Sequence, residues 1–296
     1  MNAVQRLRHR VGFRGGPTAF LTSASARCLS WIALAGLVLL LGGCRTSVNY
    51  ASVAGPRYAG AAASRQAPSA TGSDSLRLVS FNIAFAVNVD SAIALLTTHP
   101  ALRGADVVLL QEMDEPGTRR IAAALESAYV YYPAMYSRHT KRDFGNAILS
   151  KWPIIGDEKL ILPHRAFLKG TQRIATAATI RVHDTDIRVY STHLATWLEG
   201  GPGARRDQLA TILDDAAGHA RVVVGGDMNS HGVGRAATAR GYLWPTRDGP
   251  RTTALGRWDH LFQRGLTKPP GEVAGTVLEV MHASDHRPVW AAVLIR

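Results

Sequence analysis

The sequence from residue 76 onward predicts an α+β fold in which two β-sheets pack face to face and helices cover their outer surfaces. Three observations lead to this prediction. Segments with strand character outnumber helical ones, the helical segments fall between pairs of strands, and polar residues collect where strands end. An α+β sandwich fits this order of elements. No internal repeat or coiled-coil heptad stands out against it.

The first half of this region predicts two strand–helix units followed by a run of strands. A strand is expected at Arg77–Ile83 and a second, buried one at Asp106–Glu112, because apolar residues dominate both segments. Helices are expected at Ser91–Thr98 and from Pro116 onward, since proline suits the first turn of a helix. Five further strands, separated by Pro, Gly or charged turns, are expected at Tyr129–Tyr136, Gly145–Ser150, Ile154–Leu162, Arg173–His183 and Asp186–His193.

The second half is centred on the stretch Arg221–Asn229. Its three consecutive valines predict a short buried strand, and the two glycines that follow end it at a tight turn or at a close approach of another group. A helix is expected before it at Ala204–Ala217, which has apolar residues on one face and charged residues on the other. The remaining strands are expected at Trp258–Phe262, Val273–Met281 and Pro288–Ile295.

Asp227 and Asn229 leave the central strand together. At positions i and i+2 of an extended chain their side chains share a face, so a carboxylate and an amide can converge on one small polar group. Gly-Asp and Asn-Ser after a strand are also ordinary turn sequences. On this stretch alone, a turn and a functional site are equally good interpretations.

The N-terminal residues predict a targeting segment. Met1–Arg27 carries five arginines and no acidic residue, and Leu29–Leu41 is an apolar run broken only by Ser30 and Gly36. This run is too short to span a bilayer comfortably as a helix, and it ends at Cys44 after two glycines. Small residues before such a cysteine resemble the lipobox of bacterial lipoproteins, in which the peptide is cut and the cysteine is lipidated. An uncleaved signal anchor is the alternative, and both would tether the protein to a membrane.

Composition divides the chain into three parts. We expect a lipoprotein-type signal peptide at 1–43, a flexible tether rich in Ala, Ser and Gly at 44–75, and a single folded domain at 76–296. Both cysteines, Cys28 and Cys44, precede the domain, which excludes a disulfide framework or a cysteine-ligated zinc site within it. From residue 76 onward, 26 Lys and Arg face 21 Asp and Glu. This mild excess suits an anionic substrate or surface and falls short of a nucleic-acid footprint.

Polar residues at the strand ends form a recognisable set when taken in chain order. Their local sequences are Ser-Phe-Asn82, Leu-Leu-Gln-Glu112, Ser-Thr-His193, Gly-Gly-Asp227-Met-Asn229, Arg-Trp-Asp259 and Ala-Ser-Asp285-His286. The set resembles the endonuclease/exonuclease/phosphatase superfamily, which includes DNase I, abasic-site endonucleases, inositol-phosphate 5-phosphatases and bacterial sphingomyelinases. The resemblance runs from about residue 79 to 288. It implies a DNase I-like sandwich of two mainly antiparallel sheets and hydrolysis of a phosphate ester.

The resemblance also implies a role for each residue. Glu112 would be the principal ligand of Mg²⁺, for which Mn²⁺ could substitute, with Asn82 beside it and Asp285 near the cation or its waters. Asp227 would orient or deprotonate the attacking water, helped by Asn229. His193 and His286 would contact phosphate oxygens, where a protonated imidazole adds charge-assisted donation, and Asp259 would orient His286. Asn146 is expected next to the site, and Arg173 is a weaker candidate for phosphate binding.

The sequence favours a class of reaction more than a substrate. A membrane-tethered phosphoesterase outside the cytoplasm would meet phospholipid headgroups and extracellular nucleic acid. We expect a phosphodiesterase, with a phosphomonoesterase as the alternative, that belongs to the cell envelope and acts as a monomer. The loops at 163–172 and 195–203 combine apolar and basic residues, a pattern that suits a lipid headgroup at an anionic surface. An extracellular nuclease is the alternative. A non-catalytic anion-binding module is the contrasting hypothesis, because intact motifs do not prove turnover.

Overall fold

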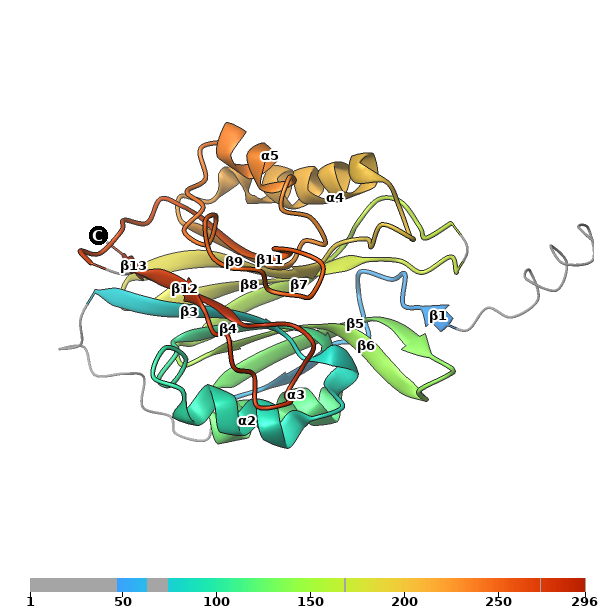
Figure 1. Cartoon of the computed structure of the whole chain (residues 1–296), viewed down its shortest axis with the longest axis horizontal. Helices are drawn as coiled ribbons and strands as arrows, with labels where there is room; N and C mark the ends of the chain where they lie inside the picture. The colour runs from blue at the N-terminus through green and yellow to red at the C-terminus, as the bar shows by residue number, and fades with distance from the viewer. Residues whose placement is uncertain (1–46, 63–73, 168, 272, 296) are drawn as a thin grey trace, which may run out of the picture. The chain divides into compact units, whose positions relative to one another are not determined.

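The computed structural model describes residues 47–62, 74–167, 169–271 and 273–295 (Figure 1). The described residues all belong to one compact unit of the chain, Arg45–Arg296. The expected signal peptide and Cys44 lie outside the described residues. Within the described part of the chain, no helix is both long enough and apolar enough to cross a membrane.

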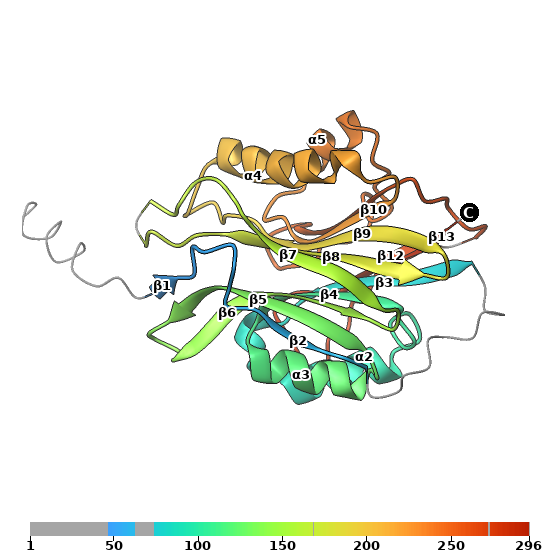
Figure 2. The ribbon, with the colours of Figure 1, turned by 180° about the vertical axis from the view of Figure 1, so that it is seen from behind.

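Two sheets pack face to face (Figures 1 and 2). The larger has the order β1-β5-β6-β4-β3-β13-β12, with β2 also paired to β5. Its strands are β1 (Ser47–Asn49), β2 (Tyr58–Gly60), β3 (Ser75–Asn82), β4 (Val107–Met113), β5 (Ala128–Ser137), β6 (Arg142–Ser150), β12 (Ala274–Thr276) and β13 (Val289–Leu294). The smaller has the order β11-β10-β9-β8-β7. Its strands are β7 (Ile154–Ile161), β8 (Ile174–Val182), β9 (Thr185–His193), β10 (Val222–Asp227) and β11 (Asp259–Arg264).

Helices cover the outer face of each sheet. Figure 1 shows α2 (Val89–Thr98) and α3 (Glu115–Ala124) on the larger sheet, and α4 (Pro202–Asp215) and α5 (Gly234–Ala239) on the smaller. Short 3₁₀ turns lie at Ala84–Ala86 and Ala216–Gly218. This is the α+β sandwich that the sequence predicts, and most pairings are antiparallel, with parallel pairs at β3–β4 and β9–β10.

Three apolar layers hold the elements together, and strand alternation explains them. Along β3, Leu76 and Leu78 enter the core between the sheets, whereas Val79 and Phe81 point to the other face and pack under α2 and α3. The third layer lies between the smaller sheet and its helices, and Leu209 of α4 contributes to it. Because each sheet is covered on both faces, its central strands are apolar on both sides, as the sequence of β4 and β10 indicates.

The two glycines of β10 are there because other groups approach the backbone closely. A Cβ atom on Gly225 would lie 2.5 Å from Leu109 Cδ1, and one on Gly226 would lie 1.8 Å from the carbonyl oxygen of Thr192. Of the two interpretations that the sequence allowed, close approach is therefore correct. It lets the strand that ends in Asp227 lie tightly against β9 and the larger sheet.

The prediction of a flexible tether at 44–75 is wrong for residues 47–60. β1 and β2 both pair with β5, and Arg57 donates two hydrogen bonds to the carboxylate of Asp157. Lys159 Nζ donates to the carbonyl oxygens of Tyr50 and Gly55. Composition did not indicate this order, because the partners lie about a hundred residues away in the chain. The folded unit therefore begins before residue 76.

Most other elements follow the sequence prediction, with two differences. The strand expected at Val273–Met281 is confined to β12, because the chain leaves the sheet edge after Thr276. Helix α5 was not predicted. It is a short segment of small residues whose position is set by Trp244, since the ring carbons of Trp244 lie against Gly234 at its start.

His260 lies in an aromatic cluster beneath α5, where its ring is 4.9 Å from that of Trp244, and its Nε2–H donates to the carbonyl oxygen of Arg257. Burial lowers the pKa of His260 to about 3. In the unfolded chain a histidine has a pKa of about 6.5, so unfolding takes up a proton between these values. Stability present above pH 6.5 is therefore lost as the pH falls toward 3, by up to about 1.4 kcal/mol per pH unit.

The test is urea denaturation at a series of pH values. In His260→Gln, which keeps a donor for Arg257, the free energy of unfolding should depend on pH less steeply between pH 6.5 and 4 than in the wild type. His139→Gln changes an exposed loop histidine and should leave the pH dependence as it is. An unaltered slope in His260→Gln would show that another group governs acid unfolding.

Candidate active site

Strand pairing brings the polar strand ends of both sheets to one edge of the sandwich. β3 and β4 are parallel, so Asn82 and Glu112 leave the larger sheet at the same end. β9 and β10 are parallel as well, with His193 opposite Asp227. The antiparallel strand β11 starts at this edge and places Asp259 opposite Asp227 from the other side. Residues from five strands and two sheets therefore meet here.

The segment before β13 completes the group. β13 runs antiparallel to β3, so residues 284–286 lie beside the end of β3. Ser284 Oγ donates to the carbonyl oxygen of Asn82 at 2.7 Å and accepts the backbone N–H of His286 at 3.0 Å. This hydroxyl fixes the loop against the strand and sets the position of the His286 ring.

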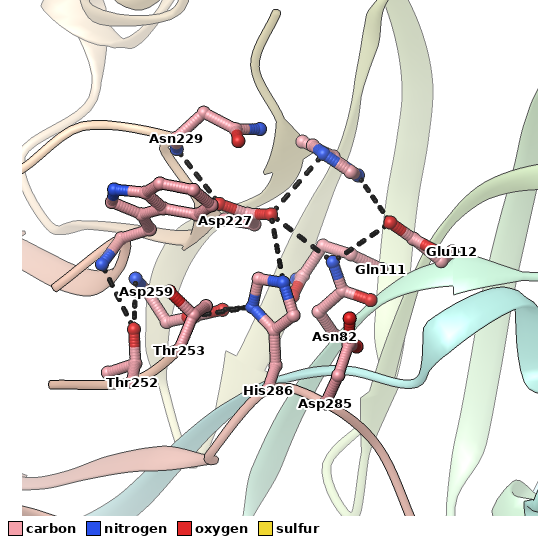
Figure 3. A network of polar contacts seen from close by, with 12 residues as sticks. Asn82, Gln111, Glu112, Asp227, Asn229, Thr252, Thr253, Asp259, Asp285 and His286 are labelled. Carbon is pink, nitrogen blue, oxygen red and sulfur yellow. Dashed lines mark hydrogen bonds and ion pairs between the residues drawn. The ribbon is translucent and has the colours of Figure 1, made fainter. Parts of the chain in front are cut away.

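Asp227 is the centre of the network (Figure 3). Its Oδ1 accepts the backbone N–H of Asn229 at 2.8 Å. Its Oδ2 accepts from Asn82 Nδ2 at 3.2 Å and lies 3.3 Å from His193 Nε2 and 3.7 Å from His286 Nε2. The carboxylate is almost completely buried, and Asp259 and Glu112 are close enough to act on it through their negative charge. The bond from Asn229 N–H to Oδ1 is the turn that the sequence allowed, and the contacts of Oδ2 show that the same carboxylate also faces the other strand ends.

Asp227 and His286 both have raised pKa values, and the charge of Asp259 contributes to each shift. Burial raises the pKa of Asp227 to about 7, and the charge of Asp259 adds to the effect. Burial alone would lower the pKa of His286, but the charge of Asp259 and its hydrogen bond to Nδ1, at 2.9 Å, outweigh burial and raise that pKa to about 10. His286 is therefore an imidazolium at neutral pH, and its Nε2–H is free to donate.

The second histidine differs from the first. Burial, with the nearby charges of Arg173 and His286, lowers the pKa of His193 well below its usual value. Neither ring nitrogen of His193 has a hydrogen-bond partner within the described structure, although both lie close to a carboxylate. Charge-assisted donation therefore fits His286 and not His193. A neutral, unpartnered imidazole can still donate to an incoming oxygen.

Glu112 is the group best suited to a metal ion. Its oxygens accept from two neutral donors, Asn82 Nδ2 at 3.2 Å and the backbone N–H of Phe85 at 3.1 Å. Among the described residues it forms an ion pair with no Lys or Arg, and burial raises its pKa. The charges of Arg173 and His286 oppose this rise in pKa but do not cancel it, so the largely buried carboxylate keeps part of its desolvation cost, which a divalent ion would remove. Asn82 Oδ1 accepts one hydrogen bond, from Ala84 N–H, and keeps a second lone pair for an ion.

A second group of possible metal ligands overlaps the first. One atom each from Asp227, Asp259 and His286 lie within 4.8 Å of one another, close enough for a single ion. The Nδ1 atom of His286 is already bonded to Asp259, and the ring is cationic, which opposes a second cation. Glu112 with Asn82 is therefore the better match to a hard divalent ion.

The main chain around Glu112 is unusual. Glu112 has a φ of 58°, and Ala84, Phe85 and Ala86 have φ values of 43°, 58° and 51°. Non-glycine residues avoid this left-handed region, and such conformations cluster at functional sites. Here the turn at Ala84–Ala86 aims the N–H of Phe85 at Glu112, so the strained segment holds the carboxylate in place.

The sequence model of the Endonuclease/Exonuclease/phosphatase family matches residues 79–286, most of the chain. The chain belongs to this family. Its members include phosphodiesterases, nucleases and phosphatases, they are hydrolases of phosphate esters, and they generally use a divalent metal. No curated protein sequence matches the chain.

Solved structures of the endonuclease/exonuclease/phosphatase family have the same fold. An endonuclease/exonuclease/phosphatase from Beutenbergia cavernae is 21% identical, with a TM-score of 0.58 over 74% of this chain and 71% of that one. Sphingomyelinase C from Streptomyces griseocarneus is 18% identical, with a TM-score of 0.56 over 74% and 99%. The human Nocturnin catalytic domain, solved with a bound sulfate anion, is 17% identical, with a TM-score of 0.54 over 75% and 94%. At these identities the likeness is one of fold.

Two residues expected from the family resemblance lie at the margin of the site. Asp285 is exposed and makes a 3.4 Å contact with Ser284 Oγ, although its charge is close enough to help burial raise the pKa of Glu112. Asn146 is buried, and its Nδ2 donates to the carbonyl oxygen of Ile174. Its amide therefore links β6 of one sheet to β8 of the other, and among the described contacts it joins none of the catalytic candidates.

Arg173 has a partner that the sequence did not indicate. Its Nη2 and Nε donate to Glu199 Oε2 at 2.5 and 3.1 Å, and its guanidinium lies 5.7 Å from the ring centre of Phe144. The Phe144 ring in turn lies 5.9 Å from the His193 ring. The Nη1 atom of Arg173 is buried without a hydrogen-bond partner in the described structure. Glu199 therefore holds Arg173 beside the site with one donor unused.

Ordinary sequence signals do not reveal Glu199, because it lies in a loop far along the chain from Arg173. We expect Glu199→Gln to lower the free energy of unfolding by about 1–3 kcal/mol, since a buried guanidinium loses its counter-charge. If Arg173 binds phosphate, the Michaelis constant should also rise more than kcat falls. Chemical denaturation and steady-state kinetics measure the two effects.

The control is Asp186→Asn, which breaks the exposed pair with Arg181. Exposed pairs contribute little, so this variant should differ from the wild type by less than about 0.5 kcal/mol. Equal stability of Glu199→Gln and the wild type would show that the Glu199–Arg173 pair contributes no net stability.

Proposed function

We propose that this member of the endonuclease/exonuclease/phosphatase family is a metal-dependent phosphodiesterase of the cell envelope that hydrolyses its substrate by in-line attack of an activated water. The observation that carries the proposal is the position of Asp227 between Asn82, Asn229 and two histidines, within reach of Glu112. A buried carboxylate with a pKa of about 7 is poised to exchange a proton near neutral pH.

Each side chain has a task in this proposal. Asp227 takes the proton of the attacking water at its Oδ2 atom. Its Oδ1 atom is held by the backbone N–H of Asn229. His286 donates its Nε2–H to a non-bridging phosphate oxygen, and Asp259 holds the ring and its charge through Nδ1. His193 donates to a second oxygen.

The proposed metal is Mg²⁺, with Mn²⁺ as an alternative, held by Glu112 with Asn82 and Asp285 beside it. When bound, it would neutralise charge on the phosphate and polarise the phosphorus–oxygen bonds. The support from this structure is the buried carboxylate of Glu112, which has only neutral donors in contact.

A phospholipid-type substrate and a nucleic acid are both consistent with the site, and we favour the phospholipid. One observation favours the nuclease alternative: the ring of Phe85, half exposed, lies 5.3 Å from that of Phe144 at the edge of the site and could stack on a base. The same pair would also contact the apolar part of a lipid.

The test is hydrolysis by residues 45–296, the compact unit that includes β1 and β2. A panel of plasmid DNA, RNA, sphingomyelin, phosphatidyl lipids, inositol phosphates and a chromogenic phosphodiester is assayed with Mg²⁺ and with EDTA. Metal-dependent cleavage of a phosphodiester supports the proposal and names the substrate class. No cleavage of any substrate by folded protein would favour a non-catalytic anion-binding module.

Membrane attachment is the second part of the proposal. Cys44 would be lipidated, which would place the domain at the periplasmic or outer face of the envelope. We expect Cys44→Ser to accumulate as an unprocessed precursor without lipid, measured by its mass and by its loss from the membrane fraction. Cys28→Ser, directly before the apolar run, is the matched control and should mature normally. Normal maturation of Cys44→Ser would exclude lipidation at this residue.

A further inference from the structure

Two loops beside the site carry large apolar side chains at their surface. In the loop at 163–172, which joins β7 to β8, Phe167 is 91% exposed. In the loop at 194–201, which follows His193, Trp197 is 66% and Leu198 62% exposed. Single exposed apolar residues are common on soluble proteins. Three of them on two adjoining loops next to a catalytic candidate call for a partner that covers them.

The two loops are fixed to each other and to the site. Glu199 of the second loop accepts from Arg173 and from Thr171 Oγ1 of the first. Gln208 of α4 also bridges them, because its Nε2 donates to the carbonyl oxygen of Pro163 and its Oε1 accepts the N–H of Ala195. The exposed apolar side chains are thus carried by a rigid pair of loops rather than by independent ones.

Exposed basic side chains lie in the Phe167 loop and in a neighbouring hairpin. Arg165 and Lys169 are exposed in the same loop as Phe167. Arg138 and Lys141 are exposed at the tip of the hairpin between β5 and β6. Across the segments 138–142, 163–172 and 194–201, the sequence contains one acidic residue, Glu199, and it is paired with Arg173. A surface with apolar and cationic groups is complementary to acidic lipid headgroups above an apolar layer.

The N-terminal strand enters the domain at this same end. β1 pairs with the part of β5 that precedes the hairpin tip. The side chain of Asn49 donates to the carbonyl oxygen of Gly170 and accepts the N–H of Gln172, so β1 is bonded to the loop that carries Phe167. Figures 1 and 2 both show β1, the hairpin tip and the β7–β8 loop at one end of the sandwich.

This connection limits the distance between the domain and its proposed anchor. Cys44 precedes Ser47 by only three residues. Three residues of extended chain span at most about 10 Å. A flexible tether over all of residues 44–75, as composition predicts, would have a much longer reach. An anchor at Cys44 would therefore hold this end of the domain, and no other, within about 10 Å of the bilayer.

We propose that the surface formed by the 163–172 loop, the 194–201 loop and the β5–β6 hairpin tip docks on a bilayer that contains acidic phospholipids. Phe167, Trp197 and Leu198 enter the headgroup layer, and the exposed basic side chains face acidic headgroups. The docking surface adds to the proposed function and rests on it for the substrate and for the anchor at Cys44: the site would open toward lipid headgroups and not toward soluble nucleic acid.

Vesicle flotation with residues 45–296 tests the surface without its anchor. The wild type is expected to float with vesicles of phosphatidylcholine and phosphatidylglycerol, less so as salt is added, and poorly with phosphatidylcholine alone. The double variant Phe167→Ser, Trp197→Ser should bind the acidic vesicles about tenfold or more weakly, because two apolar anchors are lost. Arg165→Glu with Lys169→Glu should reduce binding by a similar factor.

Ile155→Ser is the matched control. Ile155 is also half exposed, but it lies at the far end of β7 from the 163–172 loop, so its loss should not change flotation. Equal binding to both kinds of vesicle, or full binding by either double variant, would overturn the proposal. The assay needs no turnover. Vesicle binding without hydrolysis would therefore overturn the proposed function alone, and hydrolysis without vesicle binding would overturn the docking surface alone.

Discussion

Asp227→Asn is expected to lower phosphodiester hydrolysis by about 10³-fold while leaving the fold intact. A positioned general base contributes about 10²–10⁴-fold to a rate, and an amide cannot take the proton of the attacking water. The amide has the same size as the carboxylate, and its oxygen can still accept the backbone N–H of Asn229, so the turn at the end of β10 keeps its hydrogen bond. The measurement is kcat on whichever substrate the wild type cleaves.

The Asp227→Asn substitution also removes a buried carboxyl group, and burial has raised the pKa of that group to about 7. The variant should therefore be at least as stable as the wild type above pH 7, where the native carboxylate is ionised at a cost. Asp186→Asn, the same chemical change in the exposed β8–β9 hairpin, serves as control and should keep full activity. A variant at 227 with more than a tenth of the wild-type rate would remove Asp227 from the role of base.

Glu112→Gln is expected to abolish the effect of Mg²⁺ on both activity and stability. If the carboxylate is the main ligand, wild-type protein should gain about 2.7 kcal/mol of stability when Mg²⁺ is present at a hundred times its dissociation constant. The variant should gain almost none. Without metal, Glu112→Gln should be at least as stable as the wild type. The reason is that the largely buried Glu112 carboxylate accepts hydrogen bonds only from neutral donors.

Thermal denaturation with and without Mg²⁺ measures this response independently of turnover. Asp285→Asn is the comparison, because Asp285 is exposed and should weaken the response only in part. A shift in Glu112→Gln as large as that of the wild type would place the ion elsewhere, and the group of Asp227, Asp259 and His286 would be the next candidate.

The fold was predictable where a strand's burial shows as a run of apolar residues in its own sequence. The three valines of β10, and the run Val107–Leu110 in β4, are apolar on both faces because each lies in a sheet covered on both sides. The site was predictable because catalytic candidates occupy strand ends, and a strand end is marked by the change from apolar to polar residues. Family resemblance assigned their roles, and the geometry brought Asn82, Glu112, His193, Asp227, Asn229, Asp259 and His286 together.

What the sequence left out depends on partners that are distant along the chain. Residues 47–60 look like a tether by composition, yet they are ordered by β5, Asp157 and Lys159. The pairing of Glu199 with Arg173 and the different protonation of the two histidines have the same origin. Asp285 beside His286 adds to the difference in pKa, but Asp259, which is distant along the chain, and burial contribute more.

The position of β13 in the sheet has a consequence for folding during synthesis. This last strand pairs with β3, the first long strand of the same sheet, and the segment just before it carries His286 to the catalytic edge. Until residues 286–294 have left the ribosome or a secretion channel, β3 lacks a neighbour on one side and Asp259 lacks its imidazole. A chain that still lacks these residues therefore has an incomplete candidate site, and the proposed hydrolysis would begin only after β13 has joined the sheet.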